Sequence, residues 1–286
     1  MKKILILCFF IAISTIAQAQ ITIQVSDEET KETIEFASIL LPEHKKSFVA
    51  DEHGKFLIDT NKYTLPLNVI VQQFGFESKE IALQNVTGLY NVYLNPESEL
   101  LREVIIPPKN AKIKERIFGR TSEGSGKIVG TFKDYHKENR YAGLEFGLIL
   151  NTNNKLKKVK KIHWHINSLT LQRAVYSLYF YEVENGKPSK KISHADINFT
   201  ITDKSKGWMV INTEDLDIYI DGTKKIAAVL KTQKVELKNG TEEGSLILNI
   251  GIPAVSNIIT GRDSQYEEWE KAPANFPFYI TVDSYE

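Results

Sequence analysis

Two histidines flank a tryptophan in the segment KIHWHIN, residues 161–167, and this spacing can begin a metal site. Alternate side chains of a β-strand share one face, so His163 and His165 would point the same way, about 6.5–7 Å apart. Zinc needs at least one more ligand, and the segment ISHADI offers His194 and Asp196, again two residues apart. Two interpretations stay open: a four-ligand metal site if the two segments pair, or two polar strand faces near solvent. We favour the second, because short motifs often match by chance.

Other catalytic patterns are missing from the sequence. The only cysteine is Cys8, near the N-terminus, so thiol catalysis is excluded for the rest of the chain. Neither an H-E-x-x-H zinc motif nor a G-x-S-x-G nucleophile elbow occurs. A carboxylate pair for glycoside hydrolysis stays open, but no particular pair is indicated. We therefore predict a protein that is not an enzyme and needs no cofactor, with a metal-dependent hydrolase using His163 and His165 as the alternative.

Aromatic residues are dense in the second half of the chain, and we expect most of them in the core. The exception is the segment DSQYEEWEKAPANFP, residues 263–277, which is polar and contains proline. Burial is less assured in such a loop, so Tyr266 and Trp269 are the candidates for ligand binding. For both we favour the other interpretation, a local plug over the end of the core.

Five lysines lie between residues 155 and 161, in the segment NKLKKVKKIH. They could form a patch for a polyanion. We favour lysines that protect an exposed edge strand against aggregation.

The stretch MKKILILCFFIAISTIAQAQ predicts a secretory signal peptide, residues 1–19: two lysines, an apolar run and small residues before the cleavage point at Ala19. A retained anchor is the alternative, but the apolar run is shorter than the ~20 residues that span a bilayer. No later stretch could cross a membrane, so we expect no transmembrane segment in the mature chain. The predicted location is the periplasm, the outer membrane or the cell surface.

Acidic and basic residues balance at 36 each, which gives no reason to expect nucleic acid as a partner. With 42% hydrophobic residues, the 286-residue chain can form its own cores without disulfides. Its length suggests two domains of ~150 residues.

Short runs of β-formers separated by turn residues fill the chain up to about residue 106 and predict a small antiparallel β-sandwich. ITIQVSD alternates cleanly, IEFASILL is apolar enough for a central strand, and FVADEHGKFLID predicts a hairpin. Gly54 supplies the positive φ that the turn of this hairpin needs.

Four segments, VSDEETKETIEFASILL, FVADEHGKFLID, FGFESKEIAL and YNVYLNPESELLREVII, occur in the order typical of one family. In them the chain resembles the carboxypeptidase-like regulatory domain, a transthyretin-like sandwich of exported proteins of Gram-negative bacteria. The resemblance covers about residues 21–107. In these bacteria the domain often precedes the plug and barrel of outer-membrane receptors, for which this chain is too short. The resemblance implies an accessory, non-catalytic domain.

The remaining chain again predicts strands: LEFGLIL, VKKIHWHI, AVYSLYFYEV, INFTIT, GWMVINT, IAAVLKT, SLILNI and FPFYITVDS. This order suits a jelly-roll-like sandwich. We therefore expect an all-β protein with a regulatory-domain sandwich at residues 20–107, a linker at 108–127 that could include a short helix, and a jelly-roll-like sandwich at 128–286.

These features together predict an exported, non-catalytic binding or interaction protein of the bacterial envelope, with a glycan or an envelope protein as its partner. A structural envelope subunit is a further alternative. The sequence gives no oligomeric state.

Overall fold

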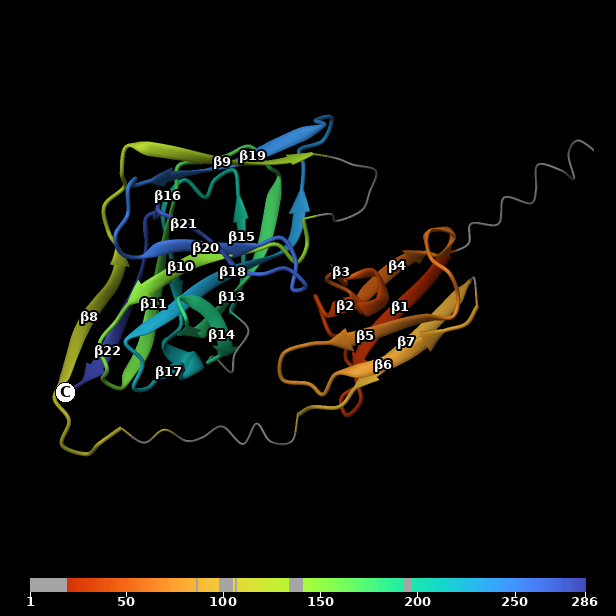
Figure 1. Cartoon of the computed structure of the whole chain (residues 1–286), viewed down its shortest axis with the longest axis horizontal. Helices are drawn as coiled ribbons and strands as arrows, with labels where there is room; N and C mark the ends of the chain where they lie inside the picture. The colour runs from red at the N-terminus through yellow and green to blue at the C-terminus, as the bar shows by residue number, and fades with distance from the viewer. Residues whose placement is uncertain (1–19, 86, 98–104, 106, 134–140, 193–196) are drawn as a thin grey trace, which may run out of the picture. The chain divides into compact units, whose positions relative to one another are not determined.

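The computed structural model describes residues 20–85, 87–97, 105, 107–133, 141–192 and 197–286 (Figure 1). Within these residues the chain forms β-strands and three short 3-10 turns, with no α-helix, and the predicted all-β class is confirmed. The described part contains no helix that is both long and apolar enough to span a membrane. The chain divides into two compact units: the first holds the described residues up to Lys45 and Ala50–Pro96, and the second holds Lys46–Val49 and the described residues from Glu97 onward.

The first unit contains the sheet β4-β1-β7 and the strands β2, β5 and β6 of the sheet β3-β2-β5-β6, while the residues of β3 are grouped with the second unit. Alternating burial along β1 and β5 shows that each sheet turns one apolar face inward. The pairing is antiparallel as expected, except that β1 pairs with β7 in parallel. The strands are β1 (Gln20–Asp27), β2 (Ser38–Leu41), β3 (Lys46–Val49), β4 (Lys55–Asp59), β5 (Leu67–Gln72), β6 (Lys79–Leu83) and β7 (Gly88–Leu94), with η1 (Pro42–His44) and η2 (Thr60–Lys62).

The predicted turn before β4 is confirmed, but the predicted hairpin is wrong, because β3 and β4 belong to different sheets. Gly54 has φ of 69°, and a Cβ there would lie 2.6 Å from the backbone oxygen of Val25, so only glycine fits. Asp51 Oδ1 accepts hydrogen bonds from the backbone N–H groups of His53 and Lys55, each at 2.8 Å. The Asp51 side chain therefore stabilises the turn.

The second unit contains three sheets. The larger facing sheets have the orders β14-β13-β18-β10-β20-β21, with β15 added to β13, and β16-β11-β22-β8, with β17 added to β11. The third sheet has the order β12-β19-β9. The strands are β8 (Ile113–Arg120), β9 (Gly126–Lys133), β10 (Glu145–Asn151), β11 (Lys157–Ile166), β12 (Ser168–Leu169), β13 (Arg173–Glu184), β14 (Lys187–Lys191), β15 (Ile197–Thr202), β16 (Gly207–Asn212), β17 (Tyr219–Ile220), β18 (Lys225–Glu236), β19 (Glu243–Ile250), β20 (Ile258–Arg262), β21 (Glu270–Ala272) and β22 (Phe278–Tyr285), with η3 (Glu214–Leu216).

One core fills the space between the sheets of the second unit. On β11 the predicted inward set is confirmed: Ile162, Trp164 and Ile166 are buried in this core. They meet Tyr176 of β13 and Phe278 of β22, among other apolar side chains of the facing sheets. Period-two alternation therefore fixes which way the side chains of β11 point.

The expected linker at 108–127 is wrong for residues 113–120, which form β8 and pair with β22 from Ile113↔Tyr285 to Arg120↔Phe278, and for residues 126–127, which begin β9. The suggested helix is absent there. β8 is an edge strand, and Ile113 and Ile117 are 60% and 54% exposed, so its sequence lacks the buried alternation of an inner strand. The ladder to β22 holds it in place.

The edge-strand interpretation of the lysines is also wrong, because β11 pairs with β16 on one side and β22 on the other. Three of the five lysines have individual partners: Lys158 Nζ lies 2.6 Å from Asp217 and Lys160 Nζ lies 3.7 Å from Asp283. Lys157 is buried and donates to the Thr223 backbone oxygen at 3.3 Å. Burial lowers the pKa of Lys157 to about 8, against an opposing effect of Asp221.

Candidate functional site

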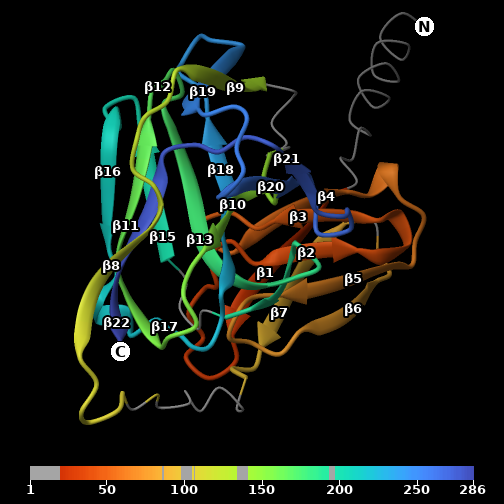
Figure 2. The same cartoon turned by 60° about the vertical axis from the view of Figure 1, so that its left-hand side comes forward.

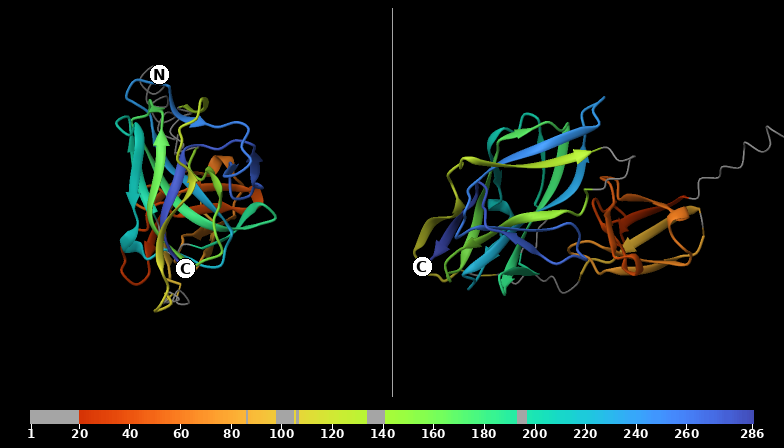
Figure 3. Two further views of the ribbon diagram at one scale, coloured as in Figure 1. Left: turned by 90° about the vertical axis from the view of Figure 1, so that its left-hand side faces the viewer. Right: turned by 45° about the horizontal axis from the view of Figure 1, so that its top comes forward.

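The candidate site lies on the outer face of the sheet β16-β11-β22-β8, whose strands run side by side in Figure 2 and are seen face-on at the left of Figure 3. His163 and His165 point outward from β11, opposite the inward set. Strand pairing places Val210 and Trp208 of β16 beside them, at His163↔Val210 and His165↔Trp208. On the other side Tyr279 of β22 pairs with His163.

The rings on this face form one continuous surface, which we call the aromatic platform: His163, His165, Trp208 and Tyr279. His163 stacks on Tyr279 with centroids 4.1 Å apart and planes at 8°. The centroid of the Trp208 ring lies 5.1 Å from that of Tyr279 and 5.2 Å from that of His165, with interplanar angles of 64° and 67°. Trp208 is 37% exposed and the neighbouring Val210 is 53% exposed, so the platform faces solvent. Exposed aromatic and aliphatic groups together on one face mark a surface suited to binding.

His163 is held in the platform by two contacts. Its Nε2 lies 3.2 Å from Thr281 Oγ1, and its ring lies flat against Tyr279. Burial, and then the positive charge of Lys161, lower the pKa of His163 below its usual 6.5. The imidazole is therefore neutral at neutral pH, which suits an aromatic packing role.

His165 has a different partner. Its Nε2 lies 3.3 Å from Oε1 of Glu123, which comes from the segment between β8 and β9. His165 is 7% exposed, and its Nδ1 is buried without a hydrogen-bond partner among the described residues. A buried polar atom without a partner costs free energy unless a ligand or water satisfies it.

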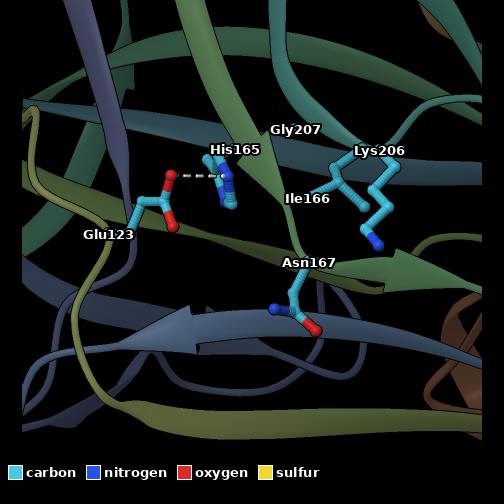
Figure 4. A pocket seen from close by; sticks show the side chains of 6 residues that line it. All are labelled: Glu123, His165, Ile166, Asn167, Lys206 and Gly207. Carbon is cyan, nitrogen blue, oxygen red and sulfur yellow. Dashed lines mark ion pairs between the residues drawn. The ribbon is translucent and has the colours of Figure 1, made fainter.

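An open hollow of about 410 Å³ lies at the end of the platform, lined by Glu123, His165, Ile166, Asn167, Lys206 and Gly207. Figure 4 shows Glu123 paired with His165 on one side and the side chains of Asn167 and Lys206 on the other. Within the described part of the chain, neither the Lys206 ammonium group nor the Asn167 amide has a side-chain partner. The hollow thus combines a carboxylate, an ammonium group and an amide next to an exposed indole.

This arrangement is suited to binding a polar ligand that also has an apolar face. The aromatic platform can pack against C–H groups. The groups around the hollow can accept and donate hydrogen bonds. For a hydrolase, the described residues contain no group of three His, Cys, Asp or Glu side chains that could hold a metal ion.

Two of the four predicted metal candidates, His163 and His165, lie within the described residues. His163 and His165 do share a face, as predicted, but their Nε2 atoms are engaged by Thr281 and Glu123 respectively. His194 and Asp196 lie outside the described residues, so the proposed pairing of the two segments stays a prediction.

Trp269 and Tyr266, the two predicted ligand-binding residues of the segment 263–277, lie in different environments. Trp269 is 9% exposed, its ring lies 5.9 Å from Tyr181, and the Arg262 guanidinium lies 4.3 Å from its centroid. Trp269 therefore corresponds to the alternative of a plug over apolar side chains. Tyr266 is 36% exposed, and a ligand role for it stays a prediction.

Sequence reasoning missed Trp208, Tyr279, Glu123 and Lys206. Trp208 and Val210 alternate in GWMVIN and gave a usable signal, but Met209 and Ile211 on the other face are equally apolar. Glu123 lies in a Gly- and Ser-rich segment that predicts a loop, and its pairing with His165 across the fold has no sequence signal.

The first unit has a clear relationship to a known family. Residues 21–106 match the CarboxypepD_reg-like domain, which confirms the resemblance of this region. The match ends at residue 106, before β8, and does not include the strands that carry the aromatic platform. No curated protein matches the chain.

Several solved structures match the chain at low identity. The clostridial cysteine protease Cwp84 after propeptide cleavage is 12% identical, with 83% of this chain and 51% of that chain covered and a TM-score of 0.41. A candidate carbohydrate-binding protein from Bacteroides uniformis is 12% identical, with 76% and 99% covered and a TM-score of 0.23. A DUF3823 family protein from Bacteroides ovatus is 9% identical, with 90% and 98% covered and a TM-score of 0.21. The chain spans about half the length of the Cwp84 structure.

Proposed function

We propose that this protein is an exported, non-catalytic binding protein of the bacterial envelope whose second unit binds a carbohydrate chain on the aromatic platform. One observation carries the proposal: an exposed indole, Trp208, lies beside a hollow whose ammonium and amide groups have no partners among the described residues. A sugar ring has C–H groups on one face and hydroxyls around its edge. The face would pack on Trp208, and the hydroxyls would reach the hollow.

The charges around the hollow favour a neutral sugar. Glu123 and Lys206 carry opposite charges, and both line the hollow (Figure 4). A hydroxyl both donates and accepts, so a neutral sugar can satisfy each of these groups. A carboxylated sugar would gain from Lys206 but meet like-charge repulsion from Glu123.

Export rests on the N-terminal sequence, with its two lysines, apolar run and Ala17–Ala19 cleavage pattern. The envelope location follows from export and from the CarboxypepD_reg-like first unit. Fractionation of the native host should place the protein in the periplasm or outer membrane, with a mature N-terminus at Gln20. Recovery of the full-length chain in the cytoplasm would contradict this part of the proposal.

An array of neutral and acidic envelope and plant-wall oligosaccharides tests the binding function. Wild-type protein should bind a set of neutral glycans, Trp208→Ala should lose them, and Tyr266→Ala should bind like the wild type. Equal binding by wild type and Trp208→Ala, or no bound glycan, would contradict the proposal.

Elemental analysis of the purified protein distinguishes the proposed binding protein from the alternative, a metal-dependent hydrolase. Stoichiometric zinc that is lost in the His163→Ala, His165→Ala double variant would favour the hydrolase. We expect the protein as purified to bind glycans without added metal.

A further inference from the structure

β9 forms one edge of the sheet β12-β19-β9 and pairs only with β19 within the described residues (Figures 1 and 3). The pairing runs from Gly126↔Ile250 to Lys133↔Glu243 without a register shift. Proteins commonly protect such edges with bulges, prolines or short strands. β9 has no bulge and no proline, and Ile128 and Val129 are 45% and 54% exposed.

The hydrogen bonds of β19 identify which backbone groups of β9 are free. The backbone carbonyls of Ser245 and Ile247 accept hydrogen bonds from the backbone N–H groups of Thr170 and Asn167. The backbone carbonyls of these two β19 residues therefore point away from β9. In an antiparallel ladder the alternate residues of β19 must then bond to β9. Their partners on β9 are Gly126, Ile128, Gly130 and Phe132.

The other residues of β9 turn their N–H and C=O groups to the free edge: Lys127, Val129, Thr131 and Lys133. The Lys133 N–H confirms this direction, because it donates to Tyr141 Oη at 2.8 Å rather than to β19. Lys127, Val129 and Thr131 thus present a row of backbone groups that an extended chain can pair with.

The charge of β9 distinguishes two partners for its free edge, a second copy of this chain and a segment of another protein. The strand contains Lys127 and Lys133 and no acidic residue, although Lys133 Nζ lies 4.0 Å from Glu243 of β19. If two copies paired antiparallel about Gly130, Lys127 of each copy would lie opposite Lys133 of the other. Like charges directly opposite destabilise a strand pair, so a second copy is disfavoured. Acidic side chains at these two positions would be stabilised instead.

The two faces of β9 define the rest of the partner. Ile128 and Val129 offer apolar contacts on opposite faces. A Cβ at Gly130 would meet nothing closer than 3.8 Å, so there is room beside this residue for a large side chain of a neighbouring strand.

We infer that β9 is a strand-addition site for an extended segment of another protein, with acidic residues opposite Lys127 and Lys133 and apolar residues between them. The surface is separate from the aromatic platform, so this inference does not depend on carbohydrate binding.

The probe is the synthetic peptide ETVFVIET, whose first and seventh residues lie opposite Lys133 and Lys127 in antiparallel register and whose phenylalanine lies opposite Gly130. We expect saturable binding to the full chain, and slower hydrogen exchange at the Val129 and Thr131 amides. The control peptide KTVFVIKT should bind about tenfold more weakly, because both charge pairs become repulsive.

Val129→Pro removes a free-edge N–H without removing a bond to β19, and it should abolish binding. Val129→Thr keeps the N–H and should bind like the wild type. Lys127→Glu should weaken binding of ETVFVIET, which keeps the test valid if the proline variant does not fold. The inference would be overturned if about 1 mM ETVFVIET did not protect the Val129 and Thr131 amides, or if both peptides bound with equal affinity. It would also be overturned by undiminished binding to a folded Val129→Pro variant, or by a dimer in sedimentation that depends on β9. Trp208→Ala should bind the peptide normally.

Discussion

The outer faces of the two large sheets of the second unit both carry aromatic residues, but among the described residues one face is covered and the other is open. On the sheet that contains β13, β18 and β10, Tyr179 and Tyr181 are buried, and Trp269 covers Tyr181. On the opposite sheet, Trp208 and Val210 remain exposed beside His163 and Tyr279.

The covered face shows how this chain seals an aromatic surface with its own residues. The segment after β20 brings Trp269 over the sheet, and Arg262 packs against the indole while pairing with Glu145. Tyr181 Oη donates to Glu145 at 3.5 Å, and burial raises the pKa of this phenol. No described segment does the same for the aromatic platform. The comparison teaches that the two sets of rings differ in what covers them rather than in residue type. The open set is the one available to a ligand.

The largest effect should come from uncovering the sealed face. Trp269→Ala should destabilise the second unit by about 3 kcal/mol, because it removes a large buried side chain and leaves Arg262 unpacked. In calorimetry this corresponds to a fall in Tm of roughly 6–12 °C. Glycan affinity of the folded fraction should be unchanged. A Trp269→Ala variant of normal stability would show that the cover is not structural.

Trp208→Ala should have the reverse profile. Its exposed indole contributes less to the core, so the loss of stability should stay below about 1 kcal/mol. The dissociation constant for a glycan selected on the array should rise about tenfold or more, by titration calorimetry, because the packing surface for the sugar is lost. Trp208→Phe retains a ring and should recover part of the affinity. A large loss of stability with unchanged affinity would reverse the roles assigned to the two faces.

Glu123→Gln should have a smaller effect on binding. The substitution keeps an acceptor but removes the charge that faces His165 and the hollow, so the affinity should fall by roughly three- to tenfold. Glu123 is 58% exposed, and stability should change by less than about 0.5 kcal/mol. Glu243→Gln on β19, outside the hollow, is the matched control and should bind normally.

The smallest effect concerns an ion pair on the sheet that carries the covered face. Arg173 donates to Glu236 through Nε and Nη2, at 2.5 and 2.9 Å, and this holds the pKa of Glu236 at about 2, with help from Lys234. The carboxyl is more acidic in the folded state than its usual 4.5, so its contribution is present above pH 4.5 and is lost as the pH falls toward 2.

Glu236→Gln should therefore lower stability near pH 6 by about 1 kcal/mol or less, since the pair is partly exposed. The difference from wild type should shrink between pH 4.5 and pH 2, as followed by thermal unfolding across this range. A difference that stays constant with pH would show that the ion pair contributes nothing to stability.

The sequence predicted the strands whose side chains alternate or are apolar on both faces. β11 and β13 follow directly from such patterns, and Gly54 marks its turn. The edge strand β8 was missed, because its exposed isoleucines and charged residues resemble a linker.

The candidate site was predictable only in part. The shared direction of His163 and His165 follows from the strand period alone. Whether an aromatic face is covered depends on where distant segments fold back, as with Trp269, which lies in a polar segment yet is buried. The pairing of Glu123 with His165 likewise joins two segments that only the tertiary fold brings together.

The central claim is that the open aromatic face binds carbohydrate, and the three tryptophans of the chain report on it separately. Trp164 lies in the core, Trp269 lies on the covered face and Trp208 lies on the platform. Their indole N–H signals can be followed by ¹H–¹⁵N NMR while cellohexaose, xylohexaose, mannohexaose and chitohexaose are titrated. We predict that at least one of these neutral glycans shifts the Trp208 signal saturably while the Trp164 and Trp269 signals stay in place. No shift with any of the four, or a shift confined to Trp269, would contradict the account.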